Sequence, residues 1–446
     1  MRNLSQIFDF RGENVKSLTI ILALGFLSLL PSYANEKFDS AHSILIEGVI
    51  PEGTIVTNSP SQWMVKPQIE EQLLYTIGQL NGLEGGTPDT SRTEIEIKEI
   101  IAQERGSYLV KYSAKLMIAW PIEQKVPEKF TFILPSNTSP NAISQFFKTY
   151  GADEHGSKKC IAWEAHNVTS GILWYYYRPQ KSSCPLKSES NQDVIHTVAY
   201  FNVSSENTKN KYPEYAKVWE DGKLVITAIF GKAVEGATSE YDAGVSAYVS
   251  TVNELLNKFG KPTSSSVTLG TRNTFSRGIQ NPEIYLTFET PKGTVDAALF
   301  LIEGIRVARS DFATKYNQRT INSDFISYSG HSGLGANIRA LAGMGNFAAD
   351  QYQIFLINGC DTFAYVDDSL QQAHFELNPD STPDKYLDII TNAMPSYFHM
   401  NSRSNMAMVN SLYESKVTYK QILSLFDRNQ RAVVTGEQDN SDPSLE

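Results

Sequence analysis

Cysteine, long apolar runs and clusters of positive charge are all scarce in this chain. An uncharged apolar run extends from Leu18 to Leu30, and its 13 residues fall short of the roughly 20 that a membrane-spanning helix needs. Positive residues precede this run and the small-residue pattern "PSYA" follows it, which is typical of a signal peptide cleaved after Ala34. We therefore expect a periplasmic or secreted protein with no membrane span after signal cleavage.

The charge balance is acidic. Lys and Arg total 39 against 49 Asp and Glu, so the formal net charge is -10. An acidic chain without a Lys/Arg cluster is poorly suited to the phosphate backbone of DNA or RNA. The sequence also contains no phosphate cradle or dinucleotide-binding fingerprint. We expect no nucleic-acid partner and no cofactor.

The cysteines divide into a pair and a single residue. In an oxidising compartment Cys160 and Cys184 are close enough in sequence to close a local loop as a disulfide, which leaves Cys360 without a partner. Zinc binding by the pair together with His155 and His166 is the alternative, but the spacing fits no compact structural zinc pattern. We predict the disulfide and no metal site, so the odd thiol needs another explanation.

The pattern of apolar and polar residues changes near residue 215. Residues 35–215 contain period-two segments such as "TEIEIKEIIA" and "GILWYYYRP", which predict a β-rich N-terminal domain with one helix near residues 67–80. Over residues 216–430, apolar strands such as "KLVITAIFG" alternate with amphipathic helices, which indicates an α/β domain with a mainly parallel sheet covered on both faces. Residues 431–446 are predicted to be a disordered acidic tail.

Two strands of the α/β half end in chemically useful residues. The strand "DFISYSG" leads into His331, and the next strand, "QYQIFLING", leads into Cys360, 29 residues further on. The carboxyl ends of neighbouring parallel strands meet at one edge of a sheet. An imidazole beside a thiol there can take the thiol proton. The pattern predicts a His331–Cys360 dyad.

This layout, "FISYSGHSG" followed by "IFLINGCD", resembles the caspase/legumain/gingipain superfamily of cysteine peptidases, including its bacterial CHAT branch. The resemblance covers residues 216–430. It implies a caspase-hemoglobinase fold, an α/β sandwich with the His after the third core strand and the Cys after the fourth.

The resemblance also implies roles for single residues. His331 would be the general base and Cys360 the nucleophile, and the Cys360 N–H and an N–H just after His331 would form the oxyanion hole. The glycines Gly330 and Gly333 would bring the loop backbone close to a substrate carbonyl. The chain departs from the family in having Ser332 directly after the His, where the family has Gly, and in having Gly rather than Ala before the Cys.

Carboxylates follow the cysteine. Asp361 adjoins the thiol and is expected to raise its pKa, while Asp367 and Asp368 lie in a segment, residues 365–380, that we interpret as a loop. These three carboxylates are the predicted lining of a substrate pocket, and a solvated acidic loop is the alternative.

Three functions remain open on this evidence. The leading hypothesis is an exported cysteine peptidase acting on a peptide or protein substrate. The second is a catalytically inactive binding or structural protein of the envelope on the same fold. The third is a serine hydrolase with Ser332 as nucleophile, Asp361 or Asp388 as acid and His399 as base, although Leu334 stands where a nucleophile elbow requires a small residue.

Overall fold

The computed structural model describes residues 37–83, 85–151, 159–163, 165, 168–308, 310–379, 381–382 and 384–436. The predicted signal peptide, the last ten residues, His155 and His166 lie outside this part. These described residues group into one compact unit by their contacts, with no division near residue 215. None of the described helices is both long enough and apolar enough to cross a membrane.

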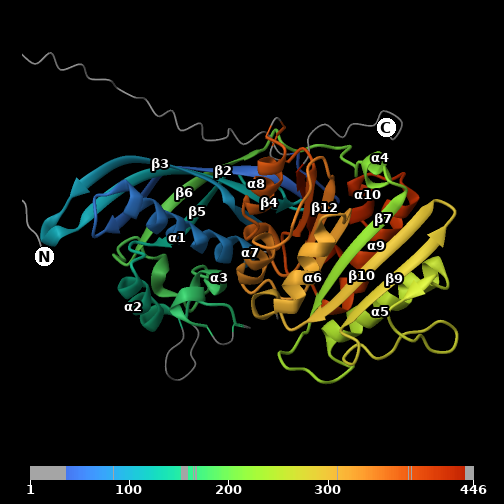
Figure 1. Ribbon diagram of the computed structural model, residues 1–446. Coiled ribbons are helices and arrows are strands. Elements are labelled where there is room, and N and C mark those ends of the chain that lie inside the picture. The colour runs from blue at the N-terminus through green and yellow to red at the C-terminus, as the bar shows by residue number, and fades with distance from the viewer. Residues whose placement is uncertain are drawn as a thin grey trace, which may run out of the picture. The chain divides into compact units, whose positions relative to one another are not determined.

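The larger of two sheets is mixed. Its five central strands, β10, β7, β11, β12 and β13, run parallel, and the strands at both margins run antiparallel. In sheet order the strands are β1 (Asp39–Ser40), β14 (Ala432–Gly436), β13 (Leu387–Asn392), β12 (Gln353–Asn358), β11 (Phe325–Ser329), β7 (Lys223–Gly231), β10 (Gly293–Ile302), β9 (Glu283–Thr290) and β8 (Ser264–Ser265). Figure 1 shows β7, β10 and β9 side by side in green and yellow.

Helices cover both faces of this sheet, as the apolar strands predicted. Alternate residues of β12 belong to different clusters: Ile354 and Leu356 pack with the helices of one face, and Phe355 and Ile357 with those of the other. Each such side chain contributes about 1.5–3 kcal/mol by its burial. The first face carries α5 (Ala243–Phe259), α9 (Asn401–Glu414) and α10 (Tyr419–Leu423), and the second α6 (Ser310–Thr320), α7 (Ala336–Ala342) and α8 (Ser369–Leu377).

The ends of α5 follow from its sequence. The Asp242 side chain caps the helix by accepting from the backbone N–H of Gly244 and Val245, and Gly260 follows the last turn with a φ of 82°. Such a positive φ favours glycine, so the helix ends where the sequence predicted.

The second sheet is antiparallel and comes from the N-terminal half, which is therefore β-rich as predicted. Its order is β3 (Thr87–Ala102), β4 (Tyr108–Pro121), β2 (Ser43–Thr57), β6 (Val194–Val203) and β5 (Lys129–Pro135). The N-terminal half also contains α1 (Gln62–Asn81), α2 (Pro140–Tyr150) and α3 (Leu173–Tyr176). The shorter helical elements are α4 (Tyr215–Val218), η1 (Glu104–Gly106), η2 (Ser170–Ile172), η3 (Pro185–Lys187), η4 (Ile305–Val307), η5 (Thr362–Ala364), η6 (Phe398–Met400) and η7 (Arg428–Gln430).

The segment "GILWYYYRP" is helical, so its prediction as a strand was wrong. It forms η2 and α3, and its backbone packs against α1 at Gly78, where an added Cβ would lie 2.2 Å from the carbonyl oxygen of Trp174. Arg178 stabilises this contact, since its Nη1 donates a hydrogen bond to the Gly78 carbonyl oxygen at 2.6 Å. Tertiary packing on a helix thus overrides the aromatic β propensity of the segment.

Two predictions of irregular structure were also wrong. Most of the supposed loop at 365–380 is helix α8, whose Leu370 and His374 are buried one turn apart. Residues 432–436, assigned to a disordered tail, form β14, because Val433 and Val434 are buried and the strand pairs with β13.

Candidate active site

The register of β11 and β12 brings His331 and Cys360 to the same end of the sheet. β11 and β12 pair in parallel with Ser329 opposite Asn358, and the Gly330 N–H extends the pairing to the Asn358 carbonyl at 3.1 Å. His331 and Cys360 each stand two residues beyond this last pair. The sheet therefore delivers both side chains to the same end of adjacent strands.

The His331 imidazole is oriented through one nitrogen. Its Nε2 lies 3.0 Å from the Ala233 carbonyl oxygen, and its ring packs edge-on against Phe398 with centroids 4.9 Å apart. A carbonyl can only accept, so Nε2 carries the proton of the neutral ring and Nδ1 keeps a lone pair. His331 is exposed, and the lone pair on its Nδ1 can accept a proton.

The Ala233 peptide is itself fixed. Its N–H donates to the Asp242 carboxylate at 3.0 Å, and the same carboxylate accepts from Val234 at 2.9 Å while capping α5. Asp242 thus connects the start of a long helix to the carbonyl that holds His331. An Asp before a helical pattern is a recognisable cap in the sequence, but nothing local reveals this second contact.

The Cys360 thiol is partly accessible and not ionised at rest. Its Sγ lies 3.8 Å from the Ser396 carbonyl oxygen. Burial and the neighbouring Asp361 carboxylate raise the pKa of Cys360 to about 11. The thiol is therefore neutral near pH 7, and a nucleophilic role requires a base at the moment of attack.

One short segment contacts both groups. Ser396 touches Cys360 and Phe398 touches His331; the two residues are two positions apart in the segment that leads from β13 into η6. Over the described part of the chain, no hydrogen bond joins the imidazole to the thiol. Catalytic hydrogen bonds in unliganded enzymes are often long and tighten only when substrate binds.

The loops around the two residues are in backbone contact. A Cβ added to Gly359 would lie 2.9 Å from the Gly330 carbonyl oxygen and 3.3 Å from the Ser332 nitrogen, so only glycine fits without displacing backbone. The N–H groups of Ser332, Gly333 and Cys360 donate to no acceptor within the described residues. These N–H groups come from both loops and have no acceptor among the described residues. They are therefore suited to donate hydrogen bonds to a developing oxyanion.

Two of the eight described non-glycine residues with a positive φ lie beside these positions. Gly333, Leu334 and Gly335 have φ values of 59°, 50° and 87°, and Asp361, directly after the cysteine, has a φ of 51°. Non-glycine residues in this region cost about 1–3 kcal/mol and cluster at functional sites. The positive φ values of Leu334 and Asp361 therefore support a functional role for this location, independently of the placement of His331 and Cys360.

A buried amide network holds the strand ends together. The Asn392 Nδ2 donates to the Asn358 side chain at 2.7 Å and to the Gly359 carbonyl at 2.9 Å, and Asn358 donates onward to Asn401 at 3.1 Å. All three amides are fully or almost fully buried. Satisfied buried networks of this kind rigidify their surroundings. Sequence reasoning missed them because a single Asn at the end of a strand or the start of a helix carries no such signal.

Asp361 is a buried link and not the wall of an open pocket, which corrects the predicted role. Its carboxylate accepts from Asn81 Nδ2 at 2.8 Å and from the Tyr175 hydroxyl at 2.6 Å, both from the N-terminal half. Burial raises the pKa of Asp361 to about 7. The residue next to the thiol thus depends on helices α1 and α3 for its partners.

The other two carboxylates lie at the start of α8. Asp367 accepts from the Ser369 N–H at 3.1 Å and lines a cavity of about 410 Å³ with residues of α1 and β3, including Glu70 and Glu71. Asp368 is exposed. No contact of either residue with Cys360 or His331 is seen in the described structure, so their assignment to a substrate pocket stays a prediction.

The contacts give the serine alternative little support. Ser332 is only 4% exposed, and no hydrogen bond links it to a histidine within the described residues. Its candidate acids are engaged elsewhere, Asp361 as above and Asp388 with the Lys211 ammonium at 2.6 Å. Its candidate base, His399, stacks on a tyrosine.

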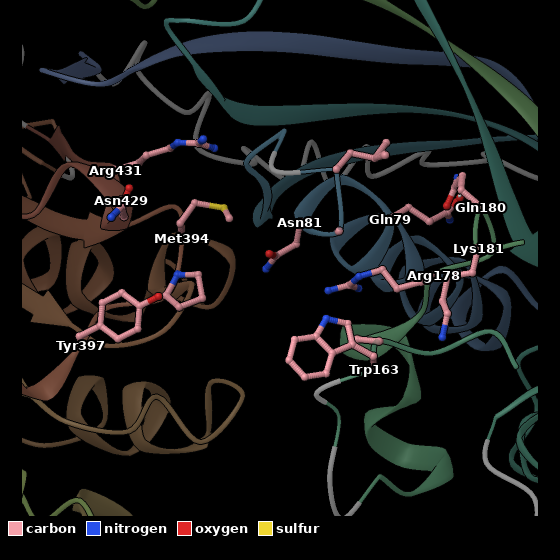
Figure 2. Close-up of a pocket in the computed structure, with 14 residues that line it drawn as sticks. Gln79, Asn81, Trp163, Arg178, Gln180, Lys181, Met394, Tyr397, Asn429 and Arg431 are labelled. Carbon is pink, nitrogen blue, oxygen red and sulfur yellow. Dashed lines mark hydrogen bonds between the residues drawn. The ribbon is translucent and has the colours of Figure 1, made fainter. Parts of the chain in front are cut away.

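A cavity of about 790 Å³ has, in its wall, sequence neighbours of a residue that contacts the cysteine. Pro395 and Tyr397, which flank Ser396, lie in its wall, as does Asn81, the partner of Asp361. Figure 2 shows Trp163 and Arg178 on one side, opposite Tyr397 and Met394 on the other.

The disulfide prediction is confirmed: Cys160 and Cys184 are bonded and Cys360 is free. In comparisons with known proteins, no family model matches the chain and no curated protein matches it.

Proposed function

We propose that this protein is a cysteine hydrolase of peptide bonds, with Cys360 as nucleophile and His331 as general base. The observation that carries the proposal is the shared position of the two residues: each stands two residues past the last pair of adjacent parallel strands, and both touch the Ser396–Phe398 segment.

The chemistry follows from the resting contacts. His331 Nδ1 takes the proton of the neutral Cys360 thiol as the sulfur attacks the scissile carbonyl carbon, and the N–H groups of Cys360 and Gly333 receive the oxyanion. The C–N bond breaks as the protonated imidazole gives its proton to the leaving amine. Water, deprotonated by His331, then hydrolyses the thioester and restores the thiol.

Topology supports a fold of the caspase-hemoglobinase type for residues 216–430. In chain order the parallel strands are β7, β10, β11, β12 and β13, so His331 follows the third and Cys360 the fourth, as the resemblance implies. The Cys160–Cys184 disulfide is compatible with an oxidising compartment and so supports export.

A second candidate is a catalytically silent binding protein on the same scaffold. It is favoured by the raised pKa of Cys360 and by the His331 contact with Ala233 instead of the thiol.

Peptide-library hydrolysis followed by mass spectrometry separates the two. The hydrolase proposal predicts cleavage by the wild-type chain, loss of cleavage in Cys360→Ala, and a decrease of about 10²-fold or more in His331→Ala. Ser332→Ala is the matched control and should retain most of the activity. Cleavage that persists in Cys360→Ala, or none by any form, rejects the dyad.

A further inference from the structure

Lys211 is buried at the end of the large sheet opposite to His331 and Cys360. It lies in the link between β6 and α4, and its side chain is only 1% exposed. Its Nζ lies 2.6 Å from Oδ1 of Asp388, the second residue of β13, whose side chain is fully buried. A primary amine and a carboxyl group are thus enclosed together, away from water.

As an ion pair these two groups are costly to bury. Each ion loses its hydration, at a cost of several kcal/mol, and only good geometry with further hydrogen bonds offsets that cost. Asp388 Oδ1 accepts no hydrogen bond of acceptable angle from any described residue, although the Lys211 Nζ is at contact distance. Condensation of the two groups to an amide removes both charges, and the cost of burying them disappears.

The other carboxyl oxygen of Asp388 is held by two hydroxyl groups. Tyr352 donates to Oδ2 at 2.5 Å, and Tyr419 donates to it at 2.8 Å. Burial raises the pKa of both hydroxyls well above the ordinary value, so both keep their protons and donate. Two preorganised donors on one carboxyl oxygen stabilise the oxyanion that forms when a nucleophile adds to the carboxyl carbon.

A second buried carboxyl group lies beside the pair. Asp384 is 2% exposed, and its Oδ2 has no hydrogen-bond partner among the described residues. Burial raises the pKa of Asp384, and the charges of Lys211 and Asp388 both act on it, which places it near both groups. A carboxyl group in this position can carry a proton between the Lys211 nitrogen and the Asp388 oxygen.

We propose that Lys211 and Asp388 condense to an amide, so that the folded protein carries an isopeptide bond between these two side chains. A proton first passes from the Lys211 ammonium to the Asp388 carboxylate. The Nζ lone pair then adds to Cγ, and the electron pair of the C=O bond moves onto Oδ2, where the two tyrosine hydroxyls receive it. Asp384 gives a proton to Oδ1 and takes one from Nζ as the Cγ–Oδ1 bond breaks. One water leaves, and no other reactant is consumed.

This reaction depends on the fold and goes beyond the proposed hydrolase function. Lys211 and Asp388 are far apart in the sequence, so only the folded chain holds the amine against the carboxyl group. Such positioning turns a slow bimolecular condensation into an effectively unimolecular one. Cys360 takes no part, and the bond should form equally in Cys360→Ala.

Peptide mapping of the full chain tests the proposal without any variant. The protein is unfolded, its disulfide is reduced and alkylated, and the chain is digested with trypsin for tandem mass spectrometry. We expect a branched peptide in which the peptide that contains Asp388 is attached to Lys211, lighter than the two linear peptides together by one water. Trypsin should not cleave after Lys211, because an acylated lysine has no positive charge. Recovery of both linear peptides, unmodified, as the main products overturns the proposal.

Lys232 is the matched control within the same digest. Its Nζ lies 2.5 Å from the Glu303 carboxylate, but the two side chains are 15% and 35% exposed, so water reaches the pair. Lys232 should therefore remain a free amine. A branched peptide at Lys232 as abundant as that at Lys211 would show condensation during handling and contradict the proposal.

Variants test the role of each group, with circular dichroism to confirm that each one folds. Asp388→Ala should abolish the branch, whereas Asp388→Asn should still form it, because amine attack on a side-chain amide releases ammonia and gives the same product. Asp384→Asn should slow its appearance after cell-free synthesis by about 10²-fold or more. An undiminished rate in Asp384→Asn, or a branch from Lys211 to Asp39 or Asp384, contradicts the reaction proposed.

Discussion

The Cys360 thiol should be slow to react in the resting protein, and the structure gives the size of the effect. Its pKa of about 11 compares with 9.0 for an ordinary thiol. At pH 8 a thiol of pKa about 11 is about 0.1% ionised, against about 10% at 9.0, so alkylation should be about 100-fold slower than in the unfolded chain.

The substitution Asp361→Asn tests what raises the pKa of Cys360. Burial makes the largest contribution and the Asp361 charge the next, so removing the charge should lower the pKa of Cys360 without restoring its ordinary value. Because the pKa of Asp361 is about 7, its carboxylate is charged mainly above that pH. Wild type and variant should therefore diverge only above about pH 7.

The assay is alkylation by iodoacetamide across pH, with the Cys360 peptide quantified by mass spectrometry. Asp367→Asn is the matched control, since this acid lies on the following segment and does not act on the thiol. His331→Ala should leave the alkylation rate nearly unchanged, because the imidazole is bonded to Ala233. A wild-type profile with an apparent pKa below about 8 that is lost in His331→Ala would reveal a resting thiolate–imidazolium pair and refute this reasoning.

Three further predictions concern stability. Replacing both Cys160 and Cys184 by Ser should lower the free energy of unfolding by about 3.5 kcal/mol, from the loop entropy of a 24-residue separation, and an unchanged urea midpoint contradicts it. Lys211→Met leaves Asp388 buried without its cation and should cost about 3–5 kcal/mol in urea unfolding; a loss below about 1 kcal/mol would show that the pair contributes little. Burial raises the pKa of Asp324 to about 8, so its contribution to stability is full below the unfolded pKa near 4 and is lost as the pH rises to about 8. Asp324→Asn should flatten the melting temperature over that range, and an identical pH slope in both proteins argues against this cause.

The α/β half could be predicted from its sequence where strands are apolar throughout and turns carry glycine. The strand "KLVITAIFG" matches β7 residue for residue, and the ends of β11 and β12 place His331 and Cys360 at one edge. These features depend on local pattern and on the rule that parallel strands share a carboxyl edge.

The surroundings of the site could not be predicted, because they come from distant parts of the chain. Asp361 takes its partners from Asn81 and Tyr175, which are 280 and 186 residues away. The contact between Ala233 and His331 spans 98 residues. Single polar residues announce no such partners, and only the packed fold brings them together.

The most direct test of the dyad is the covalent labelling of Cys360 by a peptidyl acyloxymethyl ketone, followed by tandem mass spectrometry. We predict that the label is found on Cys360 and that its rate of attachment falls by about 10²-fold in His331→Ala, since the imidazole acts as base only when a carbonyl is being attacked. A label on Ser332, or an equal rate in His331→Ala, would contradict the assignment of these two residues as a catalytic pair.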